Sequence, residues 1–413
     1  MNWQARSELV LTLARVLYVN GQSTDQTLAA TERLSHSLGL HTTVLARWGE
    51  LQLRVDEGGV TRVSAVAADP TGVAMTRVAA AMRVVEDLGT GRLTPVTAKE
   101  ELEAISQAPL APTWLFTLAA AAGAAALAVI FGVEHLPAAA LIFVSAGAGA
   151  ILRRCLAHYR TNVFLQPFSA ALLAGIIGAL AVRYNLSSSL RLVGVCPCMV
   201  LVPGPAVLNG ALDLIKGRIH LGSARLVFAG LVILAISVGL LLGFALLGVS
   251  LPVDAAGTAV PLWMDTLAAG VAVFAYAVFF SMPMHMLAWP IAVGMLAHAL
   301  RWVALTMLAS GTASAAAIAC LIVGLILTPV ARRWHMPFAA IGFAAVVSMI
   351  PGVFLFRMAS GLVQLAGSPA SPGLASATLS DGITALTVIV AMSLGLIIPK
   401  LAIDHLSEKY SLP

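Results

Sequence analysis

Eight ionisable residues fall inside long apolar stretches of this 413-residue chain. A charged side chain at the centre of a bilayer costs at least roughly 2.5–3.5 kcal/mol, so each is a functional candidate. They are Arg191, Asp213, Asp265, His285, His298, Arg301, Arg357 and Asp381. Lys216 could pair with Asp213 one helical turn away, and a helix N-terminus suits Asp265 and Asp381. Arg357 has no obvious carboxylate near it in the sequence, so Asp213, Asp381 or an anionic substrate group is its expected partner.

The stretch from about residue 186 to 215 contains most of the unusual residues. It is half as long again as the roughly 20 residues that cross a bilayer. It contains Cys196 and three prolines, among them Pro203 followed by Gly204. Proline removes a backbone donor and clashes with the preceding turn, and lipid offers the freed groups no partner. We therefore predict a broken membrane helix that lines a polar site.

The same feature recurs 148 residues later, where Pro351 and Gly352 interrupt a second over-long apolar segment. Interrupted segments at corresponding positions of two halves indicate the binding site of a secondary transporter. Asn209 is the repeat equivalent of Arg357. The candidate substrate-binding residues are Cys196, Pro203, Gly204, Asn209, Asp213, Pro351, Gly352 and Arg357.

Composition separates a polar N-terminal segment from an apolar remainder. The chain is 59% hydrophobic and 10% charged, with a mean hydropathy of +0.93. Residues 1–108 contain 12 of the 19 acidic residues and 10 of the 24 basic ones. We predict a cytoplasmic α+β domain over 1–110, a first five-helix membrane repeat over 111–250 and a second over 251–413. The remaining basic excess is typical of cytoplasmic flanks and does not indicate nucleic-acid binding.

Periodicity predicts helices over about 5–19 and 25–38, strands over 42–48, 51–55 and 61–66, and helices opening at Asp69-Pro70 and near Ala98. Ten membrane spans follow, at about 112–132, 136–152, 163–182, 186–215, 222–248, 262–281, 285–307, 311–330, 337–365 and 379–399. Spans four and nine are the broken ones. Five spans per half imply two repeats of inverted topology.

Lysine and arginine predict the orientation. A cytoplasmic N-terminal domain places ten basic residues inside: Arg153, Arg154, Arg160, Lys216, Arg218, Arg225, Arg332, Arg333, Lys400 and Lys409. Four lie outside or within the membrane: Arg183, Arg191, Arg301 and Arg357. Both termini are therefore expected in the cytoplasm.

Several chemistries lack their motifs. No Walker-type phosphate loop, His-Glu-x-x-His or Gly-x-Ser-x-Gly sequence occurs, which argues against ATP use and hydrolysis. Cys196 and Cys198 have no further metal ligands nearby, so packing is the favoured interpretation. We expect no cofactor, no metal and no enzyme activity.

Around Cys196-Pro197, Leu201-Val202-Pro203-Gly204 and Asp213-Leu214 the sequence resembles the threonine/serine exporter family of bacterial membrane proteins. The resemblance extends to Gly21-Gln22-Ser23-Thr24 and Leu38-Gly39-Leu40 in the N-terminal domain. At about position 28 the family pattern has an acidic residue, whereas this chain has Leu28. The resemblance implies a cytoplasmic domain and two membrane units, fused here, in the bacterial inner membrane.

The function expected is proton-coupled antiport that exports threonine or serine. The alternative is export of a small dicarboxylate such as succinate, with a hydrolase or a channel as further classes. The helices that resume after Pro203 and Pro351 would bind a carboxylate through their N-termini, aided by Arg357 and Asn209. Asp213 would bind the ammonium or the proton. Expected partners are the small substrate, protons and lipid; a homo-oligomer is compatible with the sequence.

Overall fold

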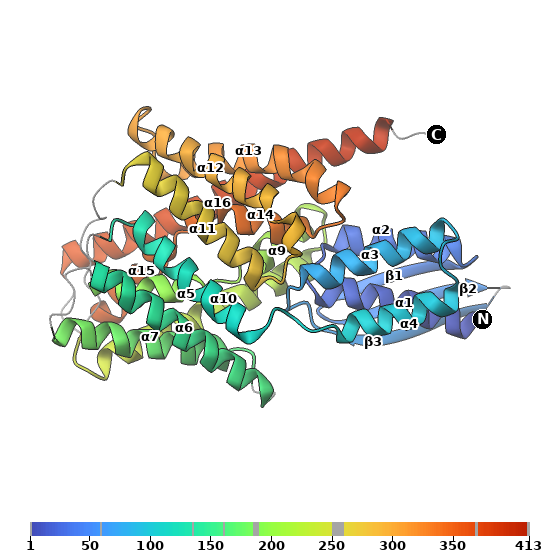
Figure 1. The fold of residues 1–413 in the computed structure, drawn as a ribbon, viewed down its shortest axis with the longest axis horizontal. Coiled ribbons are helices and arrows are strands. Elements are labelled where there is room, and N and C mark those ends of the chain that lie inside the picture. Colours follow the sequence, from blue (N-terminus) through green and yellow to red (C-terminus); the bar gives the residue numbers. More distant parts are fainter. Residues whose placement is uncertain are drawn as a thin grey trace.

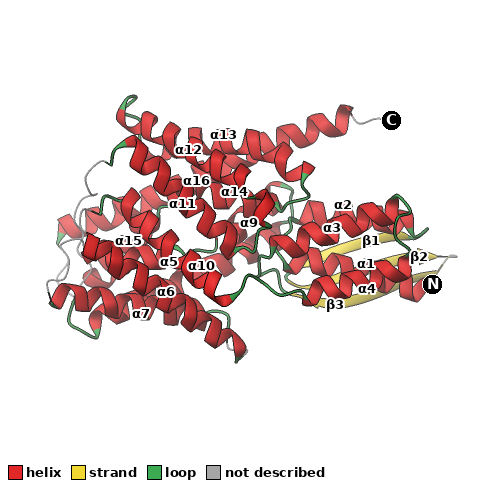
Figure 2. Ribbon diagram, in the orientation of Figure 1, coloured by secondary structure: helices red, strands yellow, loops and turns green. Residues whose placement is uncertain are grey.

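The computed structural model describes residues 2–57, 60–133, 136–159, 162–184, 190–249, 260–367 and 371–410. Figure 1 shows an N-terminal domain beside a larger body of helices, and Figure 2 shows that the strands lie only in the N-terminal domain. Arg160 lies outside the described residues, as do the side chains of Arg191 and Lys409.

The N-terminal domain is a three-stranded antiparallel sheet packed against helices, as predicted. Leu51, Leu53 and Val55 of the central strand are buried, while the alternate Arg54 is exposed. This alternation of period two is what a sheet with one covered face requires. The elements are α1 (Trp3–Val19), α2 (Thr24–Ser37), β1 (His41–Arg47), β2 (Gly49–Glu57), β3 (Val60–Ala68), α3 (Met75–Gly89) and α4 (Pro95–Gln107).

The helix expected to open at Asp69-Pro70 begins later, at Met75, so that prediction of its start was wrong. The reason is contact with the membrane helices. The amide of Met75 donates to the carbonyl of Phe280 (2.9 Å) and that of Thr76 to Ser281 (3.1 Å). The α3 N-terminus is thus capped by the chain just after an apolar helix, and residues 70–73 form a loop against it.

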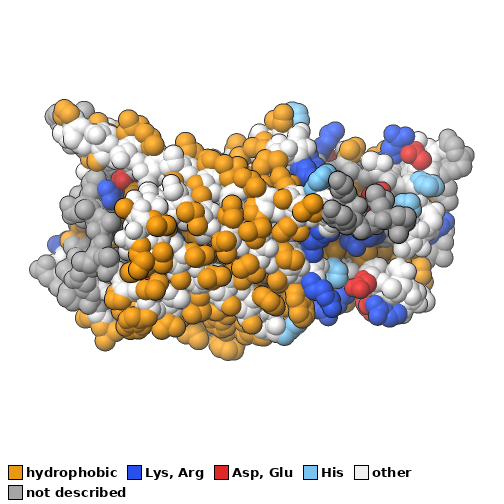
Figure 3. All heavy atoms as spheres, turned by 90° about the horizontal axis from the view of Figure 1, so that it is seen from above, with side chains coloured by type: hydrophobic (Ala, Val, Ile, Leu, Met, Phe, Trp, Pro, Cys, Tyr) orange, Lys and Arg blue, Asp and Glu red, His pale blue; other side chains and the backbone are white. Residues whose placement is uncertain are grey.

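The remaining helices are apolar and long. Among the described residues, eight are long and apolar enough to cross a membrane, or ten spans result if each of two bent pairs counts as one. Figure 3 shows their hydrophobic side chains as a belt, with Lys, Arg and His gathered at its edge beside the N-terminal domain. They are α5 (Thr113–Ile130), α6 (Leu136–His158), α7 (Leu165–Arg183), α8 (Leu190–Met199), α9 (Gly204–Ile215), α10 (Ile219–Ala245), α11 (Leu262–Phe279), η1 (Met284–Met286), α12 (Ala288–Thr306), α13 (Thr312–Arg333), α14 (Phe338–Val346), η2 (Val347–Met349), α15 (Gly352–Gly367) and α16 (Pro372–Tyr410).

Glycines let α7 and α10 approach closely. A Cβ added to Gly239 would lie 2.3 Å from the carbonyl oxygen of Phe168, and one on Gly175 would lie 2.3 Å from that of Leu240. Real Cβ atoms do not come so close, so only glycine permits these backbones to touch. The glycines of this pair are therefore packing residues.

The helices of the two halves correspond one to one. Leu190 and Phe338 begin helices 148 residues apart, as do Gly204 and Gly352, which is the separation of Pro203 and Pro351. The packing also repeats: α5 lies on α6 as α11 lies on α12, and α7 lies on α10 as α13 lies on α16. Between the halves, α8 contacts α15 and α9 contacts α14, a reciprocal pair of contacts.

Candidate functional site

The first apolar segment breaks at Pro203, as predicted. α8 ends at Met199, α9 begins at Gly204, and their axes are bent by 52°. Pro203 and Pro205 have no N–H and cannot extend the hydrogen-bond ladder of α8. The second segment breaks in the same way before Gly352, with a bend of 67°.

The two breaks touch. A Cβ added to Gly204 would lie 1.4 Å from Cε2 of Phe343, and one on Gly352 would lie 2.8 Å from Cγ of Met199. A small apolar cavity of about 50 Å³ lies between the breaks, lined by Gly204 and Pro351 among others. The two Pro-Gly breaks therefore lie next to one another.

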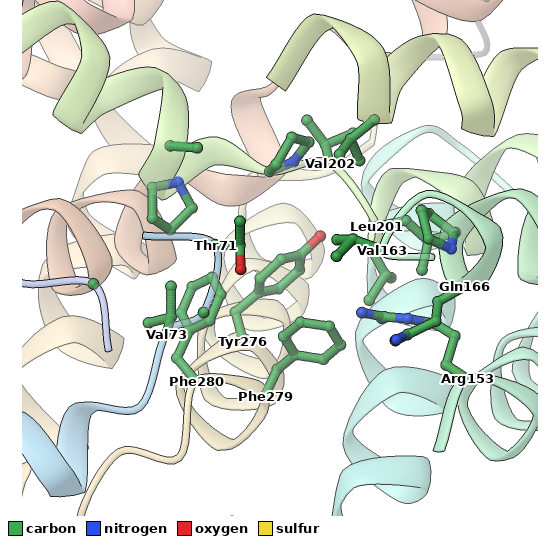
Figure 4. Close-up of a pocket in the computed structure, with 18 of the residues that line it drawn as sticks. Thr71, Val73, Arg153, Val163, Gln166, Leu201, Val202, Tyr276, Phe279 and Phe280 are labelled. Carbon is green, nitrogen blue, oxygen red and sulfur yellow. The ribbon is translucent and has the colours of Figure 1, made fainter. Parts of the chain in front are cut away.

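A larger cavity of about 370 Å³ lies on the N-terminal-domain side of the first break. Its walls come from the loop of residues 70–73, from α6, α7, α10 and α11, and from the residues of the break. Figure 4 shows Tyr276 and Phe279 between Thr71 on one side and Arg153 and Gln166 on the other. Its volume is within the range of about 300–1,000 Å³ of small-molecule sites.

Arg153 on α6 faces this cavity without a compensating acid among the described residues. Its Nε is buried without a hydrogen-bond partner, and no carboxylate among the described residues pairs with it. Its guanidinium carbon lies 5.0 Å from the ring centroid of Phe279 and 5.9 Å from that of Phe116. Aromatic faces attract a cation by only about 0.5–2 kcal/mol, less than a buried charge needs. The arrangement therefore suits a carboxylate brought by a ligand.

Asn209 contributes an acceptor to the same cavity. Its Nδ2 donates to the carbonyl of Gly21 (3.3 Å), whereas its Oδ1 is buried without a partner. The amide orientation follows from the Gly21 contact, because a carbonyl can only accept. Across the cavity, the Tyr276 hydroxyl donates to the carbonyl of Met199 (2.9 Å) and anchors the end of α8.

Asp213 lies one turn beyond Asn209 and is held by two arginines. Its carboxylate is 3.0 Å from Nε of Arg225 and 3.3 Å from a guanidinium nitrogen of Arg218, and it accepts a hydrogen bond from the Thr24 hydroxyl (3.1 Å). Asp213 and Arg225 are almost completely buried. This carboxylate therefore joins α9 and α10 to the N-terminal domain.

Lys216, expected beside Asp213, faces Asp25 of α2 instead, at 3.8 Å. Arg218 also donates to Asp25, so this acid receives two cations from the α9–α10 turn. The contact could not be predicted from helical spacing, because Asp25 is distant in the sequence. With Thr24 it docks the N-terminal domain on the membrane helices.

The other predicted residues lie apart from the large cavity. Arg357 on α15 pairs with Asp381 of α16 at 3.0 Å, and neither lines the cavity. Cys196 is fully buried in the helix packing. Of the eight candidates, the structure brings Pro203 and Asn209 to the large cavity, whereas Gly204 and Pro351 line the apolar one.

Among the described residues no three His, Cys, Asp or Glu side chains gather as a metal site would require. Cys196 and Cys198, the pair considered as soft-metal ligands, are both buried.

Sequence reasoning treated Arg153 only as a charge flanking a span. A signal was present, because Arg301 lies 148 residues later and is its repeat equivalent. An arginine at the same position in both halves marks a place where the fold itself accommodates a cation near each break.

Two family models match the chain, and together they cover most of it. One, described as "Putative threonine/serine exporter", matches residues 8–247, and the other, described as "Threonine/Serine exporter, ThrE", matches residues 265–402. Comparisons with curated proteins and with solved structures gave no match. The first segment contains the N-terminal domain and the first break, and the second contains the second break. The chain therefore belongs to the threonine/serine exporter family, with both units of that family fused in one multi-pass membrane protein.

Proposed function

We propose that this protein is a secondary exporter of threonine or serine, and that the substrate binds in the 370 Å³ cavity beside the first break. One observation carries the proposal: in a member of an exporter family, an arginine without an acidic partner faces a cavity of amino-acid size at a helix break. Broken helices at the interface of two repeats are where transporters bind their substrates.

The substrate's groups have matching partners in the cavity. Its carboxylate binds the guanidinium of Arg153, where charge-assisted and bidentate hydrogen bonds are available. Its ammonium binds Oδ1 of Asn209 and the carbonyl groups that end α8 near Met199, the negative end of a helix dipole. Pro203 shapes the break between these two positions.

A dicarboxylate such as succinate is the second candidate. Arg154 lines the same cavity next to Arg153, and no acidic side chain is among its described lining residues. Two neighbouring arginines suit a dianion better than a zwitterion. However, Arg154 already donates to the carbonyl of Ala111 (2.9 Å) and lies over the Phe116 ring, which leaves it fewer free donors than Arg153.

We place the N-terminal domain and both termini in the cytoplasm of a bacterium, with the helices in the inner membrane. Basic side chains gather at the edge of the apolar belt next to this domain (Figure 3). An excess of Lys and Arg marks the cytoplasmic side of membrane helices. The 370 Å³ cavity then opens inward, as a site that loads an exporter's substrate should. Five spans in each half make the repeats inverted.

Export requires an energy source, and we propose exchange with protons. The chain contains no phosphate-binding loop, and its two-fold helix arrangement is typical of gradient-driven carriers. This mechanism makes the protein a carrier; a channel or a hydrolase would need a pore or a reactive site instead.

Counterflow in proteoliposomes tests the proposal. Vesicles containing the purified full chain are loaded with unlabelled threonine, serine or succinate, and entry of the labelled compound is followed. We expect a transient overshoot with threonine or serine, and a smaller one with succinate. A channel gives no overshoot, and absence of counterflow with all three would contradict the proposal.

A further inference from the structure

Three buried polar side chains form a chain beside the second break. Oδ2 of Asp265 lies 2.9 Å from Nδ1 of His298, and Nε2 of His298 lies 2.5 Å from Oγ of Ser348. The residues come from α11, α12 and η2, and all three are buried. Ionisable groups inside an apolar membrane bundle are rare and mark function.

At the equivalent described positions of the first half no such network is present. At the positions 148 residues earlier, the chain has three residues that do not titrate near neutral pH: Thr117, Ala150 and Val200. The neighbouring arginine, in contrast, is present in both halves, as Arg153 and Arg301. The network is therefore a difference between two otherwise corresponding units.

The space beside the network is also different. Arg301, Ser348 and Pro351 line a cavity of about 30 Å³, against about 370 Å³ beside the first break. A water molecule needs at least about 10–15 Å³, so water can enter and an amino acid cannot. The chemistry available at this place is proton binding.

We propose that His298, held between Asp265 and Ser348, binds the proton that this carrier exchanges for its substrate. In neutral His298 the Nδ1–H donates to Asp265, and Nε2 accepts from the Ser348 hydroxyl. When a proton from one side of the membrane binds Nε2, that nitrogen becomes a donor and the Ser348 hydroxyl must turn to another acceptor. The proton later leaves to the other side, and only an N–H bond has formed and broken.

Ser348 couples this change to the break. It lies in η2, three residues before Pro351, and Gly352 follows at the contact with Met199 of the first break. A change in the hydrogen bond between Ser348 and His298 therefore acts on the residues from Ser348 to Gly352, which contact the first break. The conformational change of the carrier is expected at this junction.

Charged groups of both signs lie around His298. Asp265 from α11 interacts with both His298 and Arg301, which lies one turn further along α12. Cys320 of α13 lies near Arg301, and α14 contains no ionisable residue. Burial of His298 and the Arg301 charge oppose a proton on its ring, whereas the Asp265 carboxylate favours one, and these opposing effects suit a proton that binds and leaves.

The order Ser–His–Asp also occurs in hydrolases, where it activates a nucleophile. Here Ser348 is buried beside a 30 Å³ cavity, which leaves no room for an acyl substrate. The geometry therefore favours proton binding over nucleophilic catalysis.

The inference rests on the proposed exporter function, and one set of vesicles tests both. Counterflow at equal pH measures carrier activity, and accumulation driven by a pH gradient measures coupling. In one-for-one exchange, a gradient of one pH unit supports about tenfold accumulation. We expect His298→Gln to retain counterflow and to lose accumulation together with the substrate-driven pH change reported by a dye inside the vesicles. His285→Gln is the matched control, because His285 is exposed in η1, just before the start of α12. This variant should accumulate substrate as the parent does.

Parental accumulation and proton flux in His298→Gln would overturn the inference. If that variant does not fold, Ser348→Ala decides, since it removes one hydroxyl and leaves the His298–Asp265 pair. It should shift the pH of half-maximal accumulation by at least about half a unit, and an unchanged pH profile would overturn the inference. Counterflow in the parent without accumulation driven by the proton gradient would contradict this inference and the proposed exchange with protons, but not the exporter function. Absence of any counterflow would contradict the exporter function itself.

Discussion

The arginines inside this protein differ in whether an acid accompanies them. Arg225 and Arg357 each lie 3.0 Å from a carboxylate, of Asp213 and Asp381 respectively. Arg153 has aromatic rings around it and no acid among the described residues. Removing one partner of a buried pair costs about 3–5 kcal/mol because the other charge is left uncompensated, so each of these two arginines is committed to its acid. The charge of Arg153 therefore remains available to a substrate.

Gly204 is expected to tolerate no side chain. In Gly204→Ala the new Cβ would occupy the position of the Phe343 ring, which must move out of a packed core. Overpacking of this kind costs about 1–3 kcal/mol. We expect a lower melting temperature in detergent and reduced counterflow. Gly230→Ala is the control, because a Cβ there meets nothing within 4 Å, and equal melting temperatures for both variants would refute the contact.

Tyr18 should make stability fall at high pH. Burial raises the pKa of its hydroxyl from 10.0 to about 12, although the Arg225 charge opposes this shift. Between these two values the unfolded chain loses the proton while the folded protein keeps it, so folding stability decreases as pH rises. We expect the melting temperature of the parent to fall more steeply than that of Tyr18→Phe between pH 10 and 12. If the melting temperatures of the two proteins fell equally with pH, burial would not raise the pKa of Tyr18.

At the scale of elements, the helix breaks were predictable from the sequence, whereas the contacts between elements were not. The two Pro-Gly pairs identify α8–α9 and α14–α15 as bent segments, because a proline interrupts the hydrogen bonds of its own helix whatever lies around it. Asp213 pairs with Arg218 and Arg225, which follow it beyond the turn into α10, whereas Lys216 faces Asp25 of the N-terminal domain. The helical spacing from Asp213 to Lys216 therefore pointed to the wrong residue. The start of α3 was missed for the same reason, since carbonyl groups of another element cap it.

The contact between α9 and the N-terminal domain predicts a specific effect of Asp213→Asn. The substitution leaves the buried Arg225 without its charge partner, which costs about 3–5 kcal/mol. We expect faster hydrogen exchange around Thr24, measured by mass spectrometry on the full chain. Asp25→Asn removes the ion pairs of Asp25 with Arg218 and Lys216, in which the Asp25 side chain is about a third exposed. This substitution should lower the free energy of unfolding by less than about 1 kcal/mol. Equal exchange in both variants would contradict this ranking.

At the scale of the whole molecule, the two halves share an architecture but differ in content. The helices on either side of each break begin 148 residues apart, and the helices of the two halves pack in the same pairs, which the sequence repeat anticipated from a few matches. The two halves differ in cavity volume and in the Asp265–His298–Ser348 network. Single-residue matches could not reveal this, because cavities depend on the packing of many side chains.

The meeting of the breaks predicts a crosslink between the halves. In a background without Cys155, Cys196, Cys198 and Cys320, cysteines at Met199 and Gly352 should join with a short bifunctional thiol reagent. Met199 paired with Gly367 is the control, since a Cβ on Gly367 meets nothing within 4 Å. Crosslinking of the control pair alone would exclude the arrangement of the two halves described above.

The most direct test of the substrate site is threonine counterflow by Arg153→Gln, compared with Arg333→Gln at the exposed end of α13. Loss of a charge-assisted pair with the substrate carboxylate is worth about 1.5–3 kcal/mol, or roughly ten- to a hundredfold in apparent affinity. The account predicts that the threonine concentration for half-maximal counterflow rises by this factor in Arg153→Gln, with the amount of folded protein unchanged. It predicts the parental value in Arg333→Gln. A parental value in a folded Arg153→Gln protein would contradict the account.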